Sequence, residues 1–253
     1  MTTTAQKSIP EILFKYLDAG GLKLLENLEL MFSNPADFND PFEFLPSLLS
    51  ELKDDSCGSD RTSKTQQVVK KYGCNSFIFS MTDKEHNVRM WDHYGDKHQG
   101  LMISLDFGDV LAQYYDWILP VKYSSQSRFE PLNCSLTTNE KTQSFRNIVT
   151  HKGKDWEPES EFRWILPAVN CNLPGTEKTI GQIGELRLVE GKMKAFLTIE
   201  PSSILKVTLG YLSSQALLDS VQQLRGRMNA RWKVARVKLS LNTFQFEDEW
   251  IEN

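Results

Sequence analysis

The sequence predicts an α+β fold, in which a single domain is built on a mixed, largely antiparallel, split sheet with peripheral helices. Segments of helical and strand periodicity interleave irregularly along the 253 residues, and strands dominate from residue 161 onward. No internal repeat and no change in composition marks a domain boundary, so residues 1–253 are expected to form one unit. A polar stretch near residues 51–65 is predicted to be a flexible insertion.

The first part of the chain alternates short strands and short helices. Apolar and aromatic runs predict strands, whereas apolar residues three and four positions apart predict helices. The predicted strands are 12–16, 29–32, 75–81, 101–107 and 117–123. The predicted helices are 22–28, 65–72, 88–94, 109–115 and 141–150. Gly73 and Gly95 are placed to end two of these helices.

The second part of the chain is richer in strands. The predicted strands are 162–166, 186–190, 193–199 and 204–210, and residues 233–246 are expected to form one or two more. One further helix is predicted from residue 216 to about 228, with Ser213 and Ser214 as its N-terminal caps.

Composition excludes several classes of protein. The 29 basic and 33 acidic residues give a formal charge of −4, so no strong overall basic field attracts nucleic acid. A hydrophobic content of 40% is ordinary for a globular protein and excludes collagen, coiled coil and disorder. No apolar run approaches the roughly 20 residues of a membrane helix, and residues 1–7 lack the apolar core of a secretory signal. We therefore expect a soluble, cytoplasmic protein without a membrane partner.

The four cysteines are interpreted as buried free thiols. They stand at positions 57, 74, 134 and 171, without a CxxC pair or a zinc-like pairing with histidine. Such thiols are typical of a reducing compartment.

The chain has no general catalytic motif, because GxxxxGK[ST], GxGxxG, HExxH and GxSxG are all absent. Two turn-containing segments nevertheless carry candidate ligand-binding side chains. In the segment 38–43, Asn39 and Asp40 either line a pocket or simply form a turn between aromatic anchors. In the segment 79–83, Ser80 and Thr82 lie two positions apart and so point to one face of a strand, unless they form a local turn.

Three of the four histidines gather near the segment 90–95. The spacings between His86, His93 and His98 place no two of them on one helical face, so no metal site is predicted. The segment also contains Trp91 and Tyr94, and we expect a packed Trp–Tyr corner with a hydrogen-bonded histidine.

A fourth segment, residues 154–164, combines two carboxylates with a guanidinium. Pro158 disfavours a helix, and the residues from Phe162 onward are strand-like. Glu159, Glu161 and Arg163 are therefore predicted to share one strand face. That face is either a solvated, salt-bridged edge or a functional group within a cleft, where burial is costly unless the charges are used.

These segments resemble the bacterial and archaeal domain of unknown function 2971. The resemblance runs from about residue 13 to 240 and is most specific in FNDPFE at 38–43 and MWDHYG at 90–95. Its other blocks are FKY at 14–16, FSNP at 32–35, FSM at 79–81, Gly100, VKY at 121–123, and Trp156 followed by ESEFR at 159–163. The chain departs from the family at Leu17, where Arg is usual, and in the insertion at 51–65.

The order of these parts is also similar to that of ADP-ribosyltransferase folds. Such folds carry a polar or aromatic residue on the first strand, then a Ser-x-Ser/Thr triplet, then a Glu-x-Glu strand. The resemblance implies that Lys15 or Tyr16 occupies the first position. It implies that Ser80 and Thr82 form the hydroxyl triplet, and that Glu159 and Glu161 form the Glu-x-Glu.

This second resemblance implies an enzyme that uses NAD as a substrate. The enzyme cleaves the nicotinamide–ribose bond and transfers ADP-ribose to nucleic acid, protein or water, in the manner of a bacterial toxin or anti-phage defence effector. Glu161 would stabilise the oxocarbenium-like charge, Glu159 would orient or deprotonate the acceptor, and Ser80 would steady Glu161 or the ribose. The implied NAD-binding residues are Lys15, Tyr16, Asn39, Asp40, Thr82, Trp91, His93, Tyr94 and Arg163.

Two other functions stay open at this point. The same pocket would also suit a non-catalytic sensor that binds a nucleotide or peptide. A metal-dependent nuclease would instead use Asp40, Glu43 and Glu161 to hold Mg²⁺.

A basic cluster near the end of the chain leaves a nucleic-acid acceptor open, although a solvated surface explains the cluster as well. Its members are Arg225, Arg227, Arg231, Lys233, Arg236 and Lys238.

Overall fold

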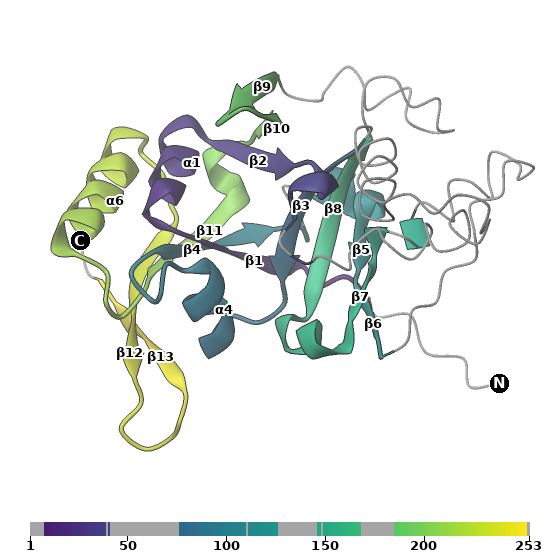
Figure 1. Ribbon diagram of the computed structural model, residues 1–253. Helices are drawn as coiled ribbons and strands as arrows, with labels where there is room; N and C mark the ends of the chain where they lie inside the picture. The colour runs from purple at the N-terminus through teal and green to yellow at the C-terminus, as the bar shows by residue number, and fades with distance from the viewer. Residues whose placement is uncertain are drawn as a thin grey trace, which may run out of the picture.

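The computed structural model describes residues 8–38, 40, 76–109, 111–125, 146–147, 149–167 and 185–251. These residues form an α+β fold with a mixed, largely antiparallel sheet, as the sequence predicts (Figure 1). The predicted insertion, the helix at 65–72 and all four cysteines lie outside this part of the chain. Within it, no helix is long and apolar enough to cross a membrane.

The main sheet runs through nine strands in an order that mixes the two ends of the chain. The order is β13 (Phe246–Trp250), β12 (Lys233–Leu239), β11 (Ile204–Leu209), β4 (Leu101–Asp106), β1 (Ile12–Leu17), β3 (Ser76–Thr82), β2 (Glu29–Ser33), β10 (Lys192–Thr198) and β9 (Leu186–Val189). All neighbours along this path are antiparallel except β11 and β12. The N-terminal strand β1 therefore lies at the centre of the sheet.

The sheet branches at β3. This strand pairs with β1 at Phe14–Thr82 and with β2 at Ser33–Ile78, one residue pair in each case. Its long partner is β8 (Glu161–Pro167), with which it pairs along its full length from Ser76 to Thr82. β8 also pairs with β5 (Ile118–Pro120), while β6 (Lys122–Ser124) and β7 (His151–Gly153) form a separate parallel pair. The branch carries β8 away from the central strands, as Figure 1 shows.

Apolar side chains on β4 divide between two cores, one on each face of the sheet. Leu101, Ile103 and Leu105 join the larger core, which includes residues of α1 (Leu22–Asn27) and α6 (Gln215–Arg227). Met102 joins the smaller core with residues of α4 (Val88–Tyr94). Alternate strand residues point to opposite faces, so a strand buried on both faces is apolar almost throughout. Figure 1 shows α1 and α6 side by side at one end of the sheet.

Two helices begin at polar side chains that cap their first backbone N–H groups. The Asn87 side chain accepts hydrogen bonds from the backbone N–H groups of Arg89 and Met90 and so begins α4. The Ser214 side chain accepts from the N–H of Leu217 and begins α6, where a cap was predicted. These side chains satisfy N–H groups that have no partner within the helix.

Several predicted elements differ in the structure. The helix expected at 109–115 is a 3₁₀-helix, Ala112–Trp117, and the strand expected at 117–123 is divided into β5 and β6. The division falls at Val121, because its N–H still bonds to Glu161 of β8 whereas the N–H of Lys122 bonds to Thr150. Of the helix expected at 141–150, residues 146, 147 and 149 are helical and the others are outside the described residues or in a turn.

Two short elements near the site were not predicted. They are β7 and a 3₁₀-helix, Lys154–Glu159, that contains Pro158. At the end of the chain, residues 233–246 hold β12 and the start of β13, which continues to Trp250. In the described part of the chain, the remaining 3₁₀-helices are Ala19–Gly21, Pro35–Asp37 and Pro201–Ser203.

Trp164 of β8 connects the branch to the larger core, and its replacement tests that role. The ring is fully buried and packs 5.2 Å from Phe32, 5.5 Å from Phe107 and 4.6 Å from Tyr114, measured between ring centroids. Trp164→Ala should lower the free energy of unfolding by about 3–5 kcal/mol, because it leaves a large cavity. Urea denaturation measures this loss. Trp250→Ala is the control, and its half-exposed ring predicts a loss below about 1 kcal/mol; equal losses would contradict the assignment.

Candidate functional site

A pocket of about 250 Å³ opens where β1, β3, β8 and α4 meet. Its wall combines charged and hydroxyl groups with aromatic rings. The polar residues are Lys15, Ser33, Asp37, Ser80, Lys152, Glu159, Glu161 and Arg163, and the aromatic residues are Phe14, Tyr16, Phe38 and Tyr94. Most of the side chains singled out in the segments 14–16, 79–83 and 154–164 therefore come together here.

The pairing of β3 with β8 places the central polar residues. Ser80 lies opposite Arg163, and Thr82 lies opposite Glu161. Because residues two apart on a strand share a face, Glu161 and Arg163 are on the face that Ser80 also occupies. The prediction of a shared face is thus met by Glu161 and Arg163.

Glu159 reaches the pocket by a different route from the one predicted. It is the last residue of the 3₁₀-helix rather than a strand residue, so the prediction that it shares a strand with Glu161 is wrong. The reason is Ser160, whose φ of 49° is left-handed and turns the chain into β8. The Glu159 carboxylate then accepts a hydrogen bond from the Tyr94 hydroxyl at 2.8 Å.

Lys152 links the two carboxylates and was not predicted as a site residue. Its Nζ lies 2.7 Å from Glu159 Oε2 and 3.3 Å from Glu161 Oε2, and 4.4 Å from the centre of the Trp156 ring. The side chain is 4% exposed. Two carboxylates this close would repel each other, and the ammonium between them removes that repulsion. No spacing in the sequence connects Lys152 with these residues, since a three-residue strand carries no clear pattern.

Arg163 holds Glu161 in a fixed orientation. Its Nε and Nη2 donate to Oε1 and Oε2 of Glu161 at 2.8 and 3.0 Å, and its Nη1 donates to the Val149 carbonyl at 2.7 Å. Two parallel hydrogen bonds to one carboxylate are the strongest form of this pair. Burial alone raises the pKa of Glu161, but the charges of Arg163 and Lys152 and hydrogen bonds from Arg163 and Ser80 lower it to about 2. Glu161 is therefore ionised at neutral pH.

Lys15 places a cation at the edge of this network. Its Nζ donates to the Ser80 carbonyl at 2.8 Å and lies 4.9 Å from the centre of the Phe79 ring. Burial lowers the pKa of Lys15 to about 8, although the charges of Glu161 and Glu159 oppose this change. The amine thus titrates close to neutral pH.

Tyr16 lines the pocket with its ring, whereas its hydroxyl bonds to the loop before α4. The ring lines the pocket and meets Trp91 edge-on, with centroids 5.0 Å apart. Its Oη lies 2.9 Å from the Lys84 carbonyl, also contacts the Glu85 carbonyl, and accepts from the N–H of Asn87. Burial raises the pKa of this hydroxyl above its usual value.

Of the other residues predicted to bind NAD, those that the structure describes do not line the pocket. Trp91 is fully buried, the His93 side chain is half exposed, and neither lines the pocket. Thr82 is also fully buried, and its hydroxyl donates to the Glu159 backbone carbonyl at 2.6 Å, so it positions that residue. Asp40 is buried outside the described pocket wall, and Asn39 lies outside the described residues.

Three other sequence interpretations concern the Trp–Tyr corner, the basic cluster and the metal-dependent nuclease. The buried contact of Trp91 is with Tyr16, and His98 packs on the rings of Tyr211 and Phe246. In the basic cluster, Arg236 and Lys238 of β12 lie opposite Glu249 and Glu247 of β13. These cross-strand neighbours offset part of the positive charge. For the nuclease interpretation, Glu43 lies outside the described residues.

A second missed residue, Tyr123 of β6, fixes the start of β8. Its hydroxyl accepts a hydrogen bond from the backbone N–H of Glu161 at 2.7 Å. Burial raises the pKa of this hydroxyl, so it stays protonated. The sequence signal was present in the VKY block at 121–123, but it did not indicate a role.

Residues 90–164 match the family described as "Protein of unknown function (DUF2971)". The chain is similar to this family over these residues. The matched stretch begins in α4 and ends in β8, and it contains Tyr94, Lys152, Glu159, Glu161 and Arg163. The pocket thus draws most of its charged residues from the part of the chain that resembles the family. No curated protein and no solved structure matches the chain.

The Glu161 pair predicts a specific acid sensitivity. Because its folded pKa of about 2 lies below the usual 4.5, the ionised carboxylate stabilises the fold above pH 4.5 and loses this effect as the pH falls toward 2. At pH 7, Glu161→Gln should cost about 3–5 kcal/mol, since it leaves buried Arg163 unpaired. Urea denaturation at pH 6, 4 and 3 should show this difference shrinking below pH 4.5. A constant difference would contradict the prediction, and exposed Glu157→Gln should change little at any pH.

Lys15 predicts the opposite sensitivity at high pH. Its folded pKa of about 8 lies below the usual 10.5, so the buried charge destabilises the fold below pH 8, and this cost disappears as the pH rises through the folded pKa toward 10.5. Lys15→Met should therefore be more stable than wild type by about 1–2 kcal/mol at pH 7, after allowance for partial exposure. Denaturation at pH 7, 9 and 10.5 should show the gain vanish. Lys23→Met, on the exposed side of α1, is the control.

Proposed function

We propose that this chain is an ADP-ribosyltransferase-like enzyme that cleaves the nicotinamide–ribose bond of NAD and transfers ADP-ribose to a macromolecular acceptor. The observation that carries the proposal is the convergence of Glu159, Glu161 and Ser80 in one pocket with aromatic walls. Bond cleavage needs a negative charge beside the ribose, and transfer needs a second group that handles the acceptor proton. The pocket supplies both from adjoining positions.

The first step breaks the bond between nicotinamide and the ribose carbon. Nicotinamide leaves as a neutral molecule with the bonding electrons, and positive charge develops on the ribose, as in glycoside hydrolysis. Glu161 is suited to stabilise that charge, because it is ionised at neutral pH and Arg163 fixes its orientation. A charge that is already oriented needs no rearrangement when the reaction occurs.

The second step joins the ribose carbon to the acceptor. The acceptor oxygen or nitrogen forms the new bond and gives up a proton, and we assign Glu159 to receive it. Tyr94 and Lys152 hold the two oxygens of this carboxylate. The acceptor is a protein or a nucleic acid, with water as the competing acceptor. The formal charge of −4, and the acidic residues of β13 that lie opposite the basic residues of β12, give nucleic acid no general electrostatic advantage.

A non-catalytic sensor of nucleotides is the second candidate function. The observation that favours it is the engagement of both Glu161 oxygens by Arg163 and Lys152. A ribose hydroxyl must share these oxygens or replace one of the cations. If neither occurs, the pocket binds a nucleotide without cleaving it.

The proposal predicts that purified protein releases nicotinamide from NAD. Glu161→Gln should lower kcat by about 10²–10³, with little change in NAD affinity, because it removes charge that acts mainly in the transition state. Glu159→Gln should reduce labelling of the acceptor more than hydrolysis. Nicotinamide release and transfer of labelled ADP-ribose are measured separately.

The control is Glu157→Gln, which changes an exposed carboxylate on the same 3₁₀-helix that is paired with Lys154. It should keep full activity, and near-ultraviolet circular dichroism verifies that each variant is folded. Equal activity of wild type and Glu161→Gln would refute the assignment. Binding of NAD without release would support the sensor, and an absence of binding at millimolar NAD would refute the enzyme and favour a sensor of another nucleotide or of a peptide.

A further inference from the structure

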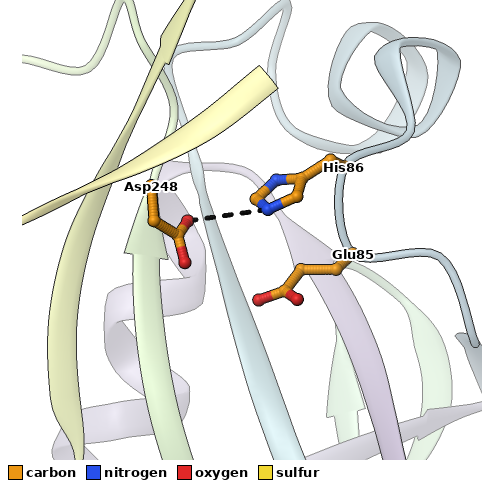
Figure 2. Close-up of side chains that lie close together, drawn as sticks. All are labelled: Glu85, His86 and Asp248. Carbon is orange, nitrogen blue, oxygen red and sulfur yellow. Dashed lines mark ion pairs between the residues drawn. The ribbon is translucent and has the colours of Figure 1, made fainter. Parts of the chain in front are cut away.

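A second cluster of polar side chains lies away from the pocket, where the loop after β3 meets β13. One ligand atom from each of Glu85, His86 and Asp248 lies within 4.8 Å of the others. Figure 2 shows the three side chains pointing toward one another from the loop and the strand. We propose that these residues bind a zinc ion, which ties β13 to the loop before α4.

The donor atoms suit zinc better than magnesium or calcium. An imidazole nitrogen with carboxylate oxygens is a common zinc set, whereas magnesium and calcium prefer oxygen alone. His86 Nε2 lies 3.9 Å from Asp248 Oδ1, too far for a hydrogen bond. Two ligands at about 2.0–2.1 Å from a tetrahedral zinc ion lie about 3.3 Å apart, so a movement of roughly half an ångström completes this edge. Water supplies the fourth position.

Lys206 lies beside the cluster, and the atoms that it contacts define its role. Its Nζ bonds to Glu85 Oε1 and, at 2.5 Å, to Asp248 Oδ2. On Asp248 this is the oxygen other than the one that faces His86. Lys206 is thus placed to orient both carboxylates from outside the metal, as second partners of metal ligands do. With Lys206 counted and His86 taken as neutral, the two carboxylates leave one negative charge for the ion.

Two buried polar atoms of the cluster have no hydrogen-bond partner among the described residues. Asp248 Oδ1 and His86 Nδ1 are buried, and neither has a hydrogen-bond partner in the described part of the chain. A buried acceptor without a partner is costly, and a metal ion would satisfy the Asp248 oxygen. The side chains of Glu85 and His86 are about one-third exposed, so solvent and an ion can reach the cluster.

The position of the cluster indicates what zinc would do. The loop that holds Glu85 and His86 also holds Asn87, the cap of α4, and its carbonyls meet the Tyr16 hydroxyl. An ion bound here would fix β13 against that loop and so stabilise the start of α4. This inference does not depend on the proposed function, because neither NAD nor the pocket takes part.

The test is zinc binding by chelator-treated, full-length protein. Calorimetry should show one equivalent of Zn²⁺ bound with micromolar or tighter affinity, and Co²⁺ should give the visible bands of a tetrahedral site. His86→Ala and Asp248→Asn should each weaken zinc binding by at least about tenfold. His93→Ala removes a histidine with a half-exposed side chain and should bind as wild type does. Zinc should raise Tm in wild type and His93→Ala only.

Three results would overturn the proposal. The first is no zinc binding by wild type at millimolar zinc. The second is wild-type affinity in folded His86→Ala, which would place the ion elsewhere in the chain. The third is binding that appears only in Lys206→Met, which would show that the Lys206 ammonium already serves as the cation of this cluster.

Discussion

The pairing of Arg163 with Glu161 is the interaction on which the pocket depends. Both side chains are almost fully buried, at 1% and 6% exposure, and neither charge is tolerable there alone. The pair is positioned because β8 follows β3 along its whole length, and that pairing is anchored by Trp164 in the larger core. The buried charge pair therefore depends on the register of β3 and β8 and on the packing of Trp164 in the core.

The rest of the site is attached to this pair through chains of hydrogen bonds. Thr82 holds the backbone of Glu159, and Tyr94 holds its carboxylate from α4. α4 begins at Asn87, whose N–H donates to the hydroxyl of Tyr16 on the central strand β1. The helix, the loop and the strand thus fix the distance between the two carboxylates, although each lies in a different part of the sequence.

Sequence periodicity predicted the parts of the site that a regular strand positions. Alternation placed Glu161 and Arg163 on one face of β8, and the spacing of Ser80 and Thr82 placed those two residues on one face of β3. Periodicity failed where the position of a side chain depends on a single backbone angle or on residues far away in the sequence. The left-handed Ser160 moves Glu159 off the strand, and Lys152 reaches the carboxylates from a strand too short to have a pattern. Asp248 likewise meets His86 only through the fold.

The two cations that contact Glu161 hold it unequally, which bears on the proposed function. Arg163 approaches at 2.8 and 3.0 Å through two parallel bonds, whereas Lys152 lies 3.3 Å from Oε2 and 2.7 Å from Glu159. Lys152 therefore pairs more strongly with Glu159 than with Glu161, and Arg163 is the stronger partner of Glu161. A ribose hydroxyl that takes the place of Lys152 at Oε2 leaves the Arg163 pair intact and Glu159 still neutralised. Under the proposed function, the ion network would admit the substrate at the cost of one long contact, without exposing an unpaired buried charge.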